Sequence, residues 1–250
     1  RPYSQKLQNI ILTLTRSISD PKNAPKLLVG TGKDDTYLCV VLTADRGLCG
    51  GFNSNICKLA KNNFKNLLEK GKKLKIIAVG SKGVDQIKRE YGKYIIKKFS
   101  FKEKKQISYN EAEIVGQEII SLFNQNEFDR CILFFNNFKN VITQIPQAQQ
   151  IIPAERKLSK EHEENSHTYE FEPDEDEILE ELLPKNISIQ VFKAFLENAA
   201  SEQGSRMTAM DNATRNAGDL VEKLTINYNR SRQASITKEL IEIISGAESL

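Results

Sequence analysis

The sequence predicts an α/β protein with a mostly parallel sheet, followed by one very long helix. Two patterns lead to this prediction. Short apolar runs alternate with amphipathic segments between residues 37 and 152, which is typical of strands and crossover helices in a parallel sheet. From residue 185 onward the chain has no proline, and apolar residues recur every three or four positions, which indicates a helix.

The N-terminal segment, residues 1–19, is expected to be helical. Its apolar residues recur at three- and four-residue steps, as one face of a helix requires. They are Tyr3, Leu7, Ile10, Ile11, Leu14 and Ile18. Asp20-Pro21 and Pro25 should end this helix.

Residues 20–184 are expected to form the α/β domain. The predicted strands are 37–43, 75–79, 94–99, 130–136 and, at the sheet edge, 141–152. The predicted helices are 53–69, a short one ending before Gly92, and 111–124. The order of these elements favours right-handed parallel connections. An acidic connector, about 154–184, closes the domain, with a short helix from Glu175 to Leu183 that Pro184 should stop.

The segment 185–250 is expected to be one helix with an apolar seam. A helix over 187–244 would be about 87 Å long at 1.5 Å per residue, far beyond an ordinary globular helix. Such length favours a coiled coil. The predicted seam residues are Met207, Met210, Leu220, Leu224, Tyr228, Ile236 and Leu240. A long solvated helix also explains why only 39% of the residues are hydrophobic, since soluble domains average roughly 45–50%.

No pattern in the sequence predicts catalysis or a cofactor. The glycine-rich turn 46–51 is favoured as a structural turn over a phosphate cradle, because neither GxGxxG nor GxxxxGK[ST] occurs. Asp45 and Arg46 have no histidine or serine partner for nucleophilic chemistry. His162 and His167 lie among glutamates, where a solvated loop is favoured over a metal site. We therefore expect a protein that is not an enzyme and holds no metal or cofactor.

Cellular context is predicted from what the chain lacks. Its four cysteines form no CxxC pair, which favours a reducing compartment. No apolar run of about 18 residues is present to span a membrane. The first residues form no signal peptide, and we expect the chain to begin inside a longer gene product.

Charge is unevenly distributed along the chain. Lysines crowd residues 58–105, and acidic residues crowd 155–181. Solvated helix faces are the favoured interpretation, with steering of partners as the alternative. Nucleic-acid binding is a further alternative, but Phe64, Tyr91 and Tyr94 are too few and scattered for the aromatic interleaving it needs.

A polar stretch, Asn229-Arg230-Ser231-Arg232-Gln233, interrupts the apolar stripe of the long helix. A polar seam weakens a coiled coil, whereas charged and amide groups there can bind carboxylates of a partner. The residues alone leave a solvated stretch and a binding stretch equally open.

Three motifs resemble one known family. Residues 42–53 read LTADRGLCGGFN, and residues 232–247 read RQASITKELIEIISGA. Between them stand ASE at 200–202, RMTAM at 206–210 and AT at 213–214. Together these closely resemble the gamma subunits of bacterial F-type ATP synthases, and the resemblance runs from Arg1 to Leu250.

The resemblance implies a fold and a role. The fold would be a Rossmann-like α/β domain at the foot of an antiparallel coiled coil of the terminal helices, with most of the N-terminal helix missing here. The role would be the central-stalk rotor, which transmits torque during proton-driven ATP synthesis or hydrolysis. The implied partners are the alpha and beta subunits, the epsilon subunit and the c-ring, at the cytoplasmic face of the inner membrane, with catalysis on beta. A coiled-coil adaptor or a nucleotide-binding enzyme remains the alternative.

The resemblance also implies contact residues. Arg230, Arg232 and Gln233 match the family stretch that contacts a loop of beta, and Arg46 and Cys49 match the turn that faces an acidic loop of beta. Tyr169, Phe171 and Glu172, followed by Pro173, resemble the segment near the c-ring and epsilon.

Overall fold

A computed structural model describes residues 1–17, 25–104, 107–154 and 175–248. The chain divides into two units, Arg1–Arg206 and Met207–Leu250. The first unit contains an α/β domain and the second is helical.

The first unit contains one five-stranded sheet in the order β3-β2-β1-β4-β5. The strands are β1 (Thr36–Leu42), β2 (Lys73–Val79), β3 (Ile95–Phe99), β4 (Arg130–Phe138) and β5 (Gln144–Ile152). The first four are parallel, and β5 pairs antiparallel with β4 at the edge. This arrangement confirms the predicted mostly parallel sheet with an edge strand at its end.

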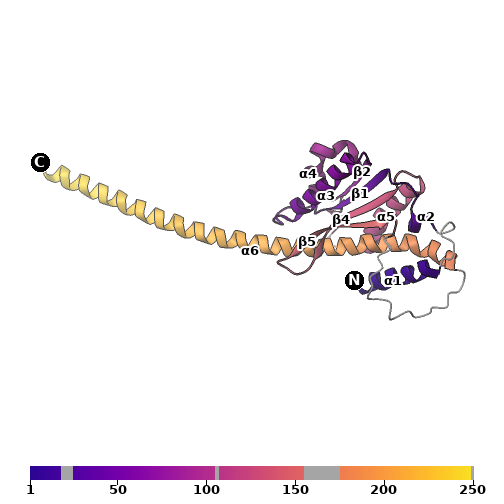
Figure 1. Ribbon diagram of the computed structural model, residues 1–250. Coiled ribbons are helices and arrows are strands. Elements are labelled where there is room, and N and C mark those ends of the chain that lie inside the picture. Colours follow the sequence, from indigo (N-terminus) through magenta and orange to yellow (C-terminus); the bar gives the residue numbers. More distant parts are fainter. Residues whose placement is uncertain (18–24, 105–106, 155–174, 249–250) are drawn as a thin grey trace. The chain divides into compact units, whose positions relative to one another are not determined.

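The helices connect and cover the strands (Figure 1). They are α1 (Pro2–Ser17), α2 (Lys26–Val29), α3 (Phe52–Glu69), α4 (Ser81–Tyr91), α5 (Tyr109–Asn124) and α6 (Glu175–Glu248), with a 3-10 turn at Gly92–Tyr94. Among the described elements, the single-turn helix α2 and the 3-10 turn had no counterpart in the prediction.

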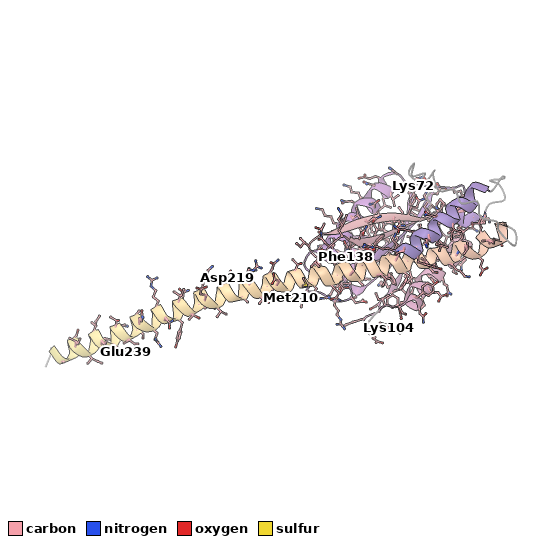
Figure 2. The ribbon with its side chains drawn as sticks, turned by 90° about the horizontal axis from the view of Figure 1, so that it is seen from below. Lys72, Lys104, Phe138, Met210, Asp219 and Glu239 are labelled. Carbon is pink, nitrogen blue, oxygen red and sulfur yellow. The ribbon has the colours of Figure 1, made fainter. Side chains whose placement is uncertain are left out.

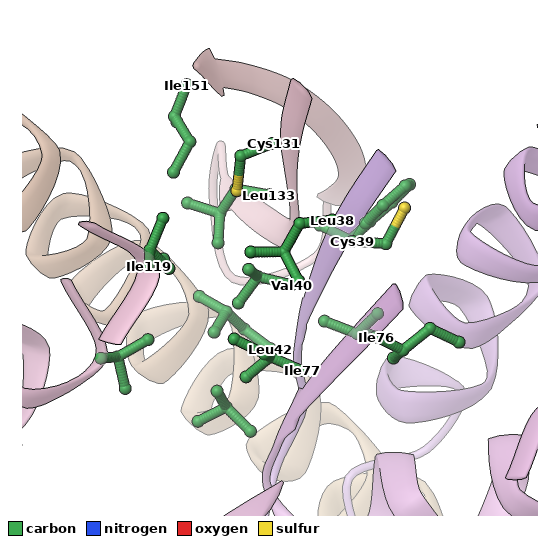
Figure 3. Packing of buried hydrophobic residues seen from close by; sticks show 14 of the residues in the cluster. Leu38, Cys39, Val40, Leu42, Ile76, Ile77, Ile119, Cys131, Leu133 and Ile151 are labelled. Atoms are coloured by element: carbon green, nitrogen blue, oxygen red, sulfur yellow. The ribbon is translucent and has the colours of Figure 1, made fainter. Parts of the chain in front are cut away.

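The core lies on both faces of β1. Residues 38–42 are all buried, as expected for a central parallel strand. Figure 3 shows Leu38 and Val40 pointing toward Ile119 of α5, whereas Cys39 points to the other side of the strand. The alternation follows from the two-residue period of a strand, so each face needs its own layer of helices.

Helix α6 begins earlier than predicted and passes through Pro184, where we expected a helix to stop. Leu179, Leu183 and Ile187 are all buried at four-residue spacing on either side of the proline. Burial of each such side chain contributes about 1.5–3 kcal/mol. Together these exceed the cost of about 3 kcal/mol for an internal proline.

Helix α1 runs antiparallel to the first part of α6. Arg1 pairs with Glu197, whereas Leu7 and Ile11 share a small core with the more N-terminal Leu179 and Leu183. The two helices lie side by side in Figures 1 and 2. Tyr3, predicted for the apolar face, is 69% exposed. Leu14 and Ile18 fall outside the side chains that the structure describes.

Candidate interaction sites

The turn after β1 is organised by Asp45. Its carboxylate accepts hydrogen bonds from the Ser81 amide (2.8 Å), the Ser100 hydroxyl (2.8 Å) and the Phe101 amide (2.9 Å). Ser81 is the first residue of α4, so the carboxylate occupies the position where a helix N-terminus would attract a phosphate. This geometry favours the structural interpretation of the turn over a nucleotide site.

Of the three non-glycine side chains in the turn, two reach the surface and one does not. Arg46 is exposed, and Leu48 is 75% exposed with a positive φ of 63°. The Cys49 side chain is buried beside Ala44 and Phe52. Asn53 Nδ2 donates to its sulfur at 3.3 Å, and burial raises the pKa of the Cys49 thiol. Leu48, an exposed apolar residue inside a glycine-rich turn, was not among the predicted contact residues.

Helix α6 holds the turn in place. Ser205 Oγ donates to the carbonyl of Cys49 at 2.8 Å, and Arg206 Nη2 donates to the carbonyl of Gly47 at 3.3 Å. Arg206 also pairs with Glu202 at 2.6 Å. Contacts of Cys49 with another chain would therefore involve its exposed neighbours Arg46 and Leu48 rather than its thiol.

A cavity of about 710 Å³ lies beyond the carboxyl ends of β1 and β2. Ligands of open α/β sheets bind at such ends. The walls include Asp45 and Glu202, whose carboxylates are already engaged by the donors described above. Among the residues that the structure describes, no group of three metal-ligating side chains occurs. His162 and His167 lie outside those residues.

The second unit, Met207–Leu250, exposes its predicted seam. From residue 210 to 247 every described side chain is exposed, and Figure 2 shows Met210, Asp219 and Glu239 along the helix. The seam residues are Met207 (61% exposed), Met210 (39%), Leu220 (56%), Leu224 (57%), Tyr228 (66%), Ile236 (49%) and Leu240 (54%). So many exposed apolar side chains on one helix mark an interaction surface.

The other predicted contact residues divide into two groups. Arg230, Arg232 and Gln233 are exposed on the second unit, with their side chains available to a partner. Tyr169, Phe171 and Glu172 lie outside the described residues. Within the described ranges, no helix is long and apolar enough to cross a membrane.

Comparison with known proteins identifies relatives over the whole chain. The family model described as ATP synthase matches residues 1–250. The ATP synthase gamma chain of Pelagibacter ubique is 67% identical over 252 residues, which cover 100% of this chain and 86% of the relative. That of Sinorhizobium fredii is 51% identical over 251 residues, with the same coverage.

Solved structures share the fold. A chain of the mitochondrial ATP synthase of Euglena gracilis matches with a TM-score of 0.64 and 22% identity, covering 99% of this chain and 90% of that one. A chain from the central stalk and c-ring of the Tetrahymena thermophila enzyme matches with a TM-score of 0.59 and 24% identity, covering 84% and 85%.

Proposed function

The chain belongs to the family of ATP synthase gamma chains, and we propose that it is the central-stalk rotor subunit of an F-type ATP synthase. In that role it transmits torque between the membrane c-ring and the hexamer of alpha and beta subunits. The observation that carries the proposal is the 67% identity to a gamma chain across the whole of this chain.

The structure supports a mechanical role. Helix α6 spans 74 residues, and a continuous helix is a stiff element able to couple distant sites. Its exposed apolar seam needs cover in water. We assign that cover to an antiparallel N-terminal helix and to the surrounding hexamer, so residues 1–19 and 185–250 would contribute the coiled coil and 20–184 the foot.

The catalytic sites are assigned to the beta subunit and not to this chain. The Asp45 carboxylate, which accepts from the Ser100 hydroxyl, is also held by the Ser81 and Phe101 amides and occupies the anion position at α4, which favours a structural role for it. Rotation of an asymmetric shaft would set the three beta sites in different states.

Contacts follow the motif matches. Arg230, Arg232 and Gln233 would bind one loop of beta, and Arg46 with the backbone of Cys49 would face another, acidic loop. Tyr169, Phe171 and Glu172 would lie near the c-ring and epsilon. The complex would place the chain at the cytoplasmic face of the inner membrane, peripheral to the bilayer.

Assembly tests the proposal. The full gene product is mixed with alpha and beta subunits, and size exclusion is combined with an ATPase assay. We expect one copy to join each hexamer and to raise ATP hydrolysis above that of alpha and beta alone. Failure to associate, under conditions where alpha and beta assemble, would overturn the rotor assignment.

A further inference from the structure

Strand β4 extends beyond its neighbour β1. Pairing between the two ends at Val41 and Phe134, whereas β4 remains paired with β5 as far as Phe138. Past residue 134, the backbone groups of β4 that face away from β5 have lost their strand partner. Buried backbone groups without a partner are costly, so other groups must replace β1 there.

Side chains of α6 take the place of the missing strand. The Asn136 amide donates to Asn198 Oδ1 at 3.2 Å, and Ser201 Oγ donates to the Asn136 carbonyl at 3.1 Å. One pleat further, the Phe138 amide donates to Glu197 Oε2 at 3.0 Å. Glu197, Asn198 and Ser201 therefore bind the same edge of β4 from within about one helical turn.

All three side chains are buried: Glu197 and Asn198 are 6% exposed and Ser201 is fully enclosed. The carboxylate of Glu197 is compensated by Arg1, whose Nη2 lies 2.6 Å from Glu197 Oε2 and also donates to the Phe138 carbonyl at 2.6 Å. This pair holds the pKa of Glu197 below its usual range. The backbone and side-chain groups that form these bonds are thus paired, whereas the Nδ2 of Asn136 itself has no hydrogen-bond partner in the structure.

These hydrogen bonds restrict the orientation of α6, which apolar packing alone does not do. Hydrophobic contact is non-directional and could hold the helix against the sheet while tolerating rotation about its axis. Hydrogen bonds weaken steeply when their angle changes. Three of them, to two residues of one strand, determine both the rotation and the axial position of α6.

The hairpin between β4 and β5 packs against the next turn of α6, at Gly204. A Cβ placed on Gly204 would lie 3.3 Å from Phe138 Cε2 and 3.4 Å from the Cα of Val141. The backbone of α6 therefore lies close to the hairpin at this point, which leaves little room for the helix to turn or slide.

We propose that Glu197, Asn198 and Ser201 form a polar key that locks α6 rotationally to the α/β domain, so that torque on the helix passes into the domain. These are positioning residues, and the inference rests on the rotor function proposed above. Without the key, α6 would keep its apolar contacts and the hydrogen bonds of Ser205 and Arg206 to the turn after β1, but it would lose its hydrogen bonds to β4, so that ATP hydrolysis would drive the foot less effectively.

The test uses the complete ATP synthase in inverted vesicles, with ATP hydrolysis and ATP-driven proton pumping measured together. The variant Asn198→Ala/Ser201→Ala should keep its hydrolysis rate but lose pumping per ATP hydrolysed. The control Val191→Ala removes buried apolar contact from the same helix and should lower the thermal midpoint while keeping the wild-type pumping ratio.

A second pair of variants separates loss of the key from a general loss of stability. Glu197→Gln loses the charge pair with Arg1 but keeps an acceptor for the Phe138 amide, so pumping should persist despite a lower midpoint. Glu197→Ala should lose pumping. Equal pumping ratios in wild type and Asn198→Ala/Ser201→Ala, or a loss of ratio that follows the midpoint in all variants, would overturn the key. A wild-type chain that never joins the complex would instead overturn the rotor function.

Discussion

Glu111 shows how one carboxylate determines the start of a helix. It accepts a hydrogen bond from the Ser108 amide at 2.8 Å and another from the Ser108 hydroxyl, and Lys104 Nζ lies 3.3 Å from its Oε1. The hydrogen bonds from Ser108, more than the lysine, lower the pKa of Glu111 from its usual 4.5 to about 2. The helix α5 so anchored supplies the buried Ile119.

The acid stability of the chain should depend on this carboxylate. Because the pKa is lower in the folded state, the charged form stabilises the fold above about pH 4.5, and this contribution is lost as pH falls toward 2. The urea midpoint of the wild type should therefore drop more steeply over that range than the midpoint of Glu111→Gln. Glu113→Gln removes a charge from the same helix and should retain the wild-type steepness; parallel curves for wild type and Glu111→Gln would contradict the prediction.

The structural role of Asp45 could not be predicted from the sequence. Beside Arg46 it resembled a candidate for chemistry, and only its hydrogen bonds show a structural role. Its donors are brought to it by the ends of two strands, with Ser81 following β2 and Ser100 and Phe101 following β3. No local pattern encodes such a convergence, since it depends on the order of the strands in the sheet.

At the scale of elements, α5 and α6 approach one another closely at one glycine. A Cβ on Gly116 would lie 2.6 Å from Ser188 Oγ and 3.1 Å from Ser188 Cα. The hydroxyl can rotate away, but the backbone atom cannot. The close approach therefore requires a residue without a side chain at this position.

Gly116→Val should lower the free energy of unfolding by about 1–3 kcal/mol, the usual cost of overpacking a core. Gly218→Val is the matched control, because nothing lies within 4 Å of a Cβ at that helical position; it should change the value by no more than about 0.5 kcal/mol. Urea unfolding of both variants measures the difference. Equal stabilities would show that the two helices can separate without cost.

The seam of the second unit allows a different prediction. Leu224 is 57% exposed, so Leu224→Asp should leave the unfolding midpoint of the isolated chain unchanged. In the assembled complex the same change would place a charge in the seam that we propose to be buried there, which is strongly unfavourable. We expect a lower thermal midpoint of the complex and a weaker association of this chain with it.

Asn212→Asp provides the control for charge. It adds the same single charge to the same helix, about 120° from Leu224 around the axis at 100° per residue. Assembly should tolerate it. If Leu224→Asp assembled as well as Asn212→Asp, position 224 would not belong to the seam.

The elements that could be predicted were those encoded by local periodicity. Strand β1 is apolar and buried from Leu38 to Leu42 because both of its faces are covered there, and α5 shows one buried face. The passage of α6 through Pro184 could not be predicted, because burial of Leu179 and Leu183 outweighs a local rule. The contact that Glu197, Asn198 and Ser201 make with β4 could not be predicted either. It depends on β4 extending further along the sheet than β1 does, which no local pattern encodes.

At the scale of the whole molecule, function depends on partners that recognise exposed groups. Arg232 and Gln233 lie in the part of α6, residues 210–247, where every described side chain is exposed, so their removal costs the isolated chain no packing. A loss of function on their replacement would report binding and not folding. Replacement of Arg215 should likewise cost the isolated chain no packing, because Arg215 is also exposed and pairs with Asp211 at 3.1 Å. Arg215 lies outside the motif that resembles the beta contact, so it serves as the control.

Arg232→Ala/Gln233→Ala should therefore impair coupled turnover and leave the fold intact. Loss of one charge-assisted hydrogen bond that forms during rotation, about 1.4 kcal/mol, would slow ATP synthesis and hydrolysis of the assembled enzyme about tenfold. Circular dichroism and the unfolding midpoint of the isolated chain should match the wild type. Arg215→Ala should turn over normally, because its charge lies elsewhere on the helix. Wild-type rates in the double variant would remove Arg232 and Gln233 from the torque path and leave the apolar seam as the surface through which the hexamer drives the shaft.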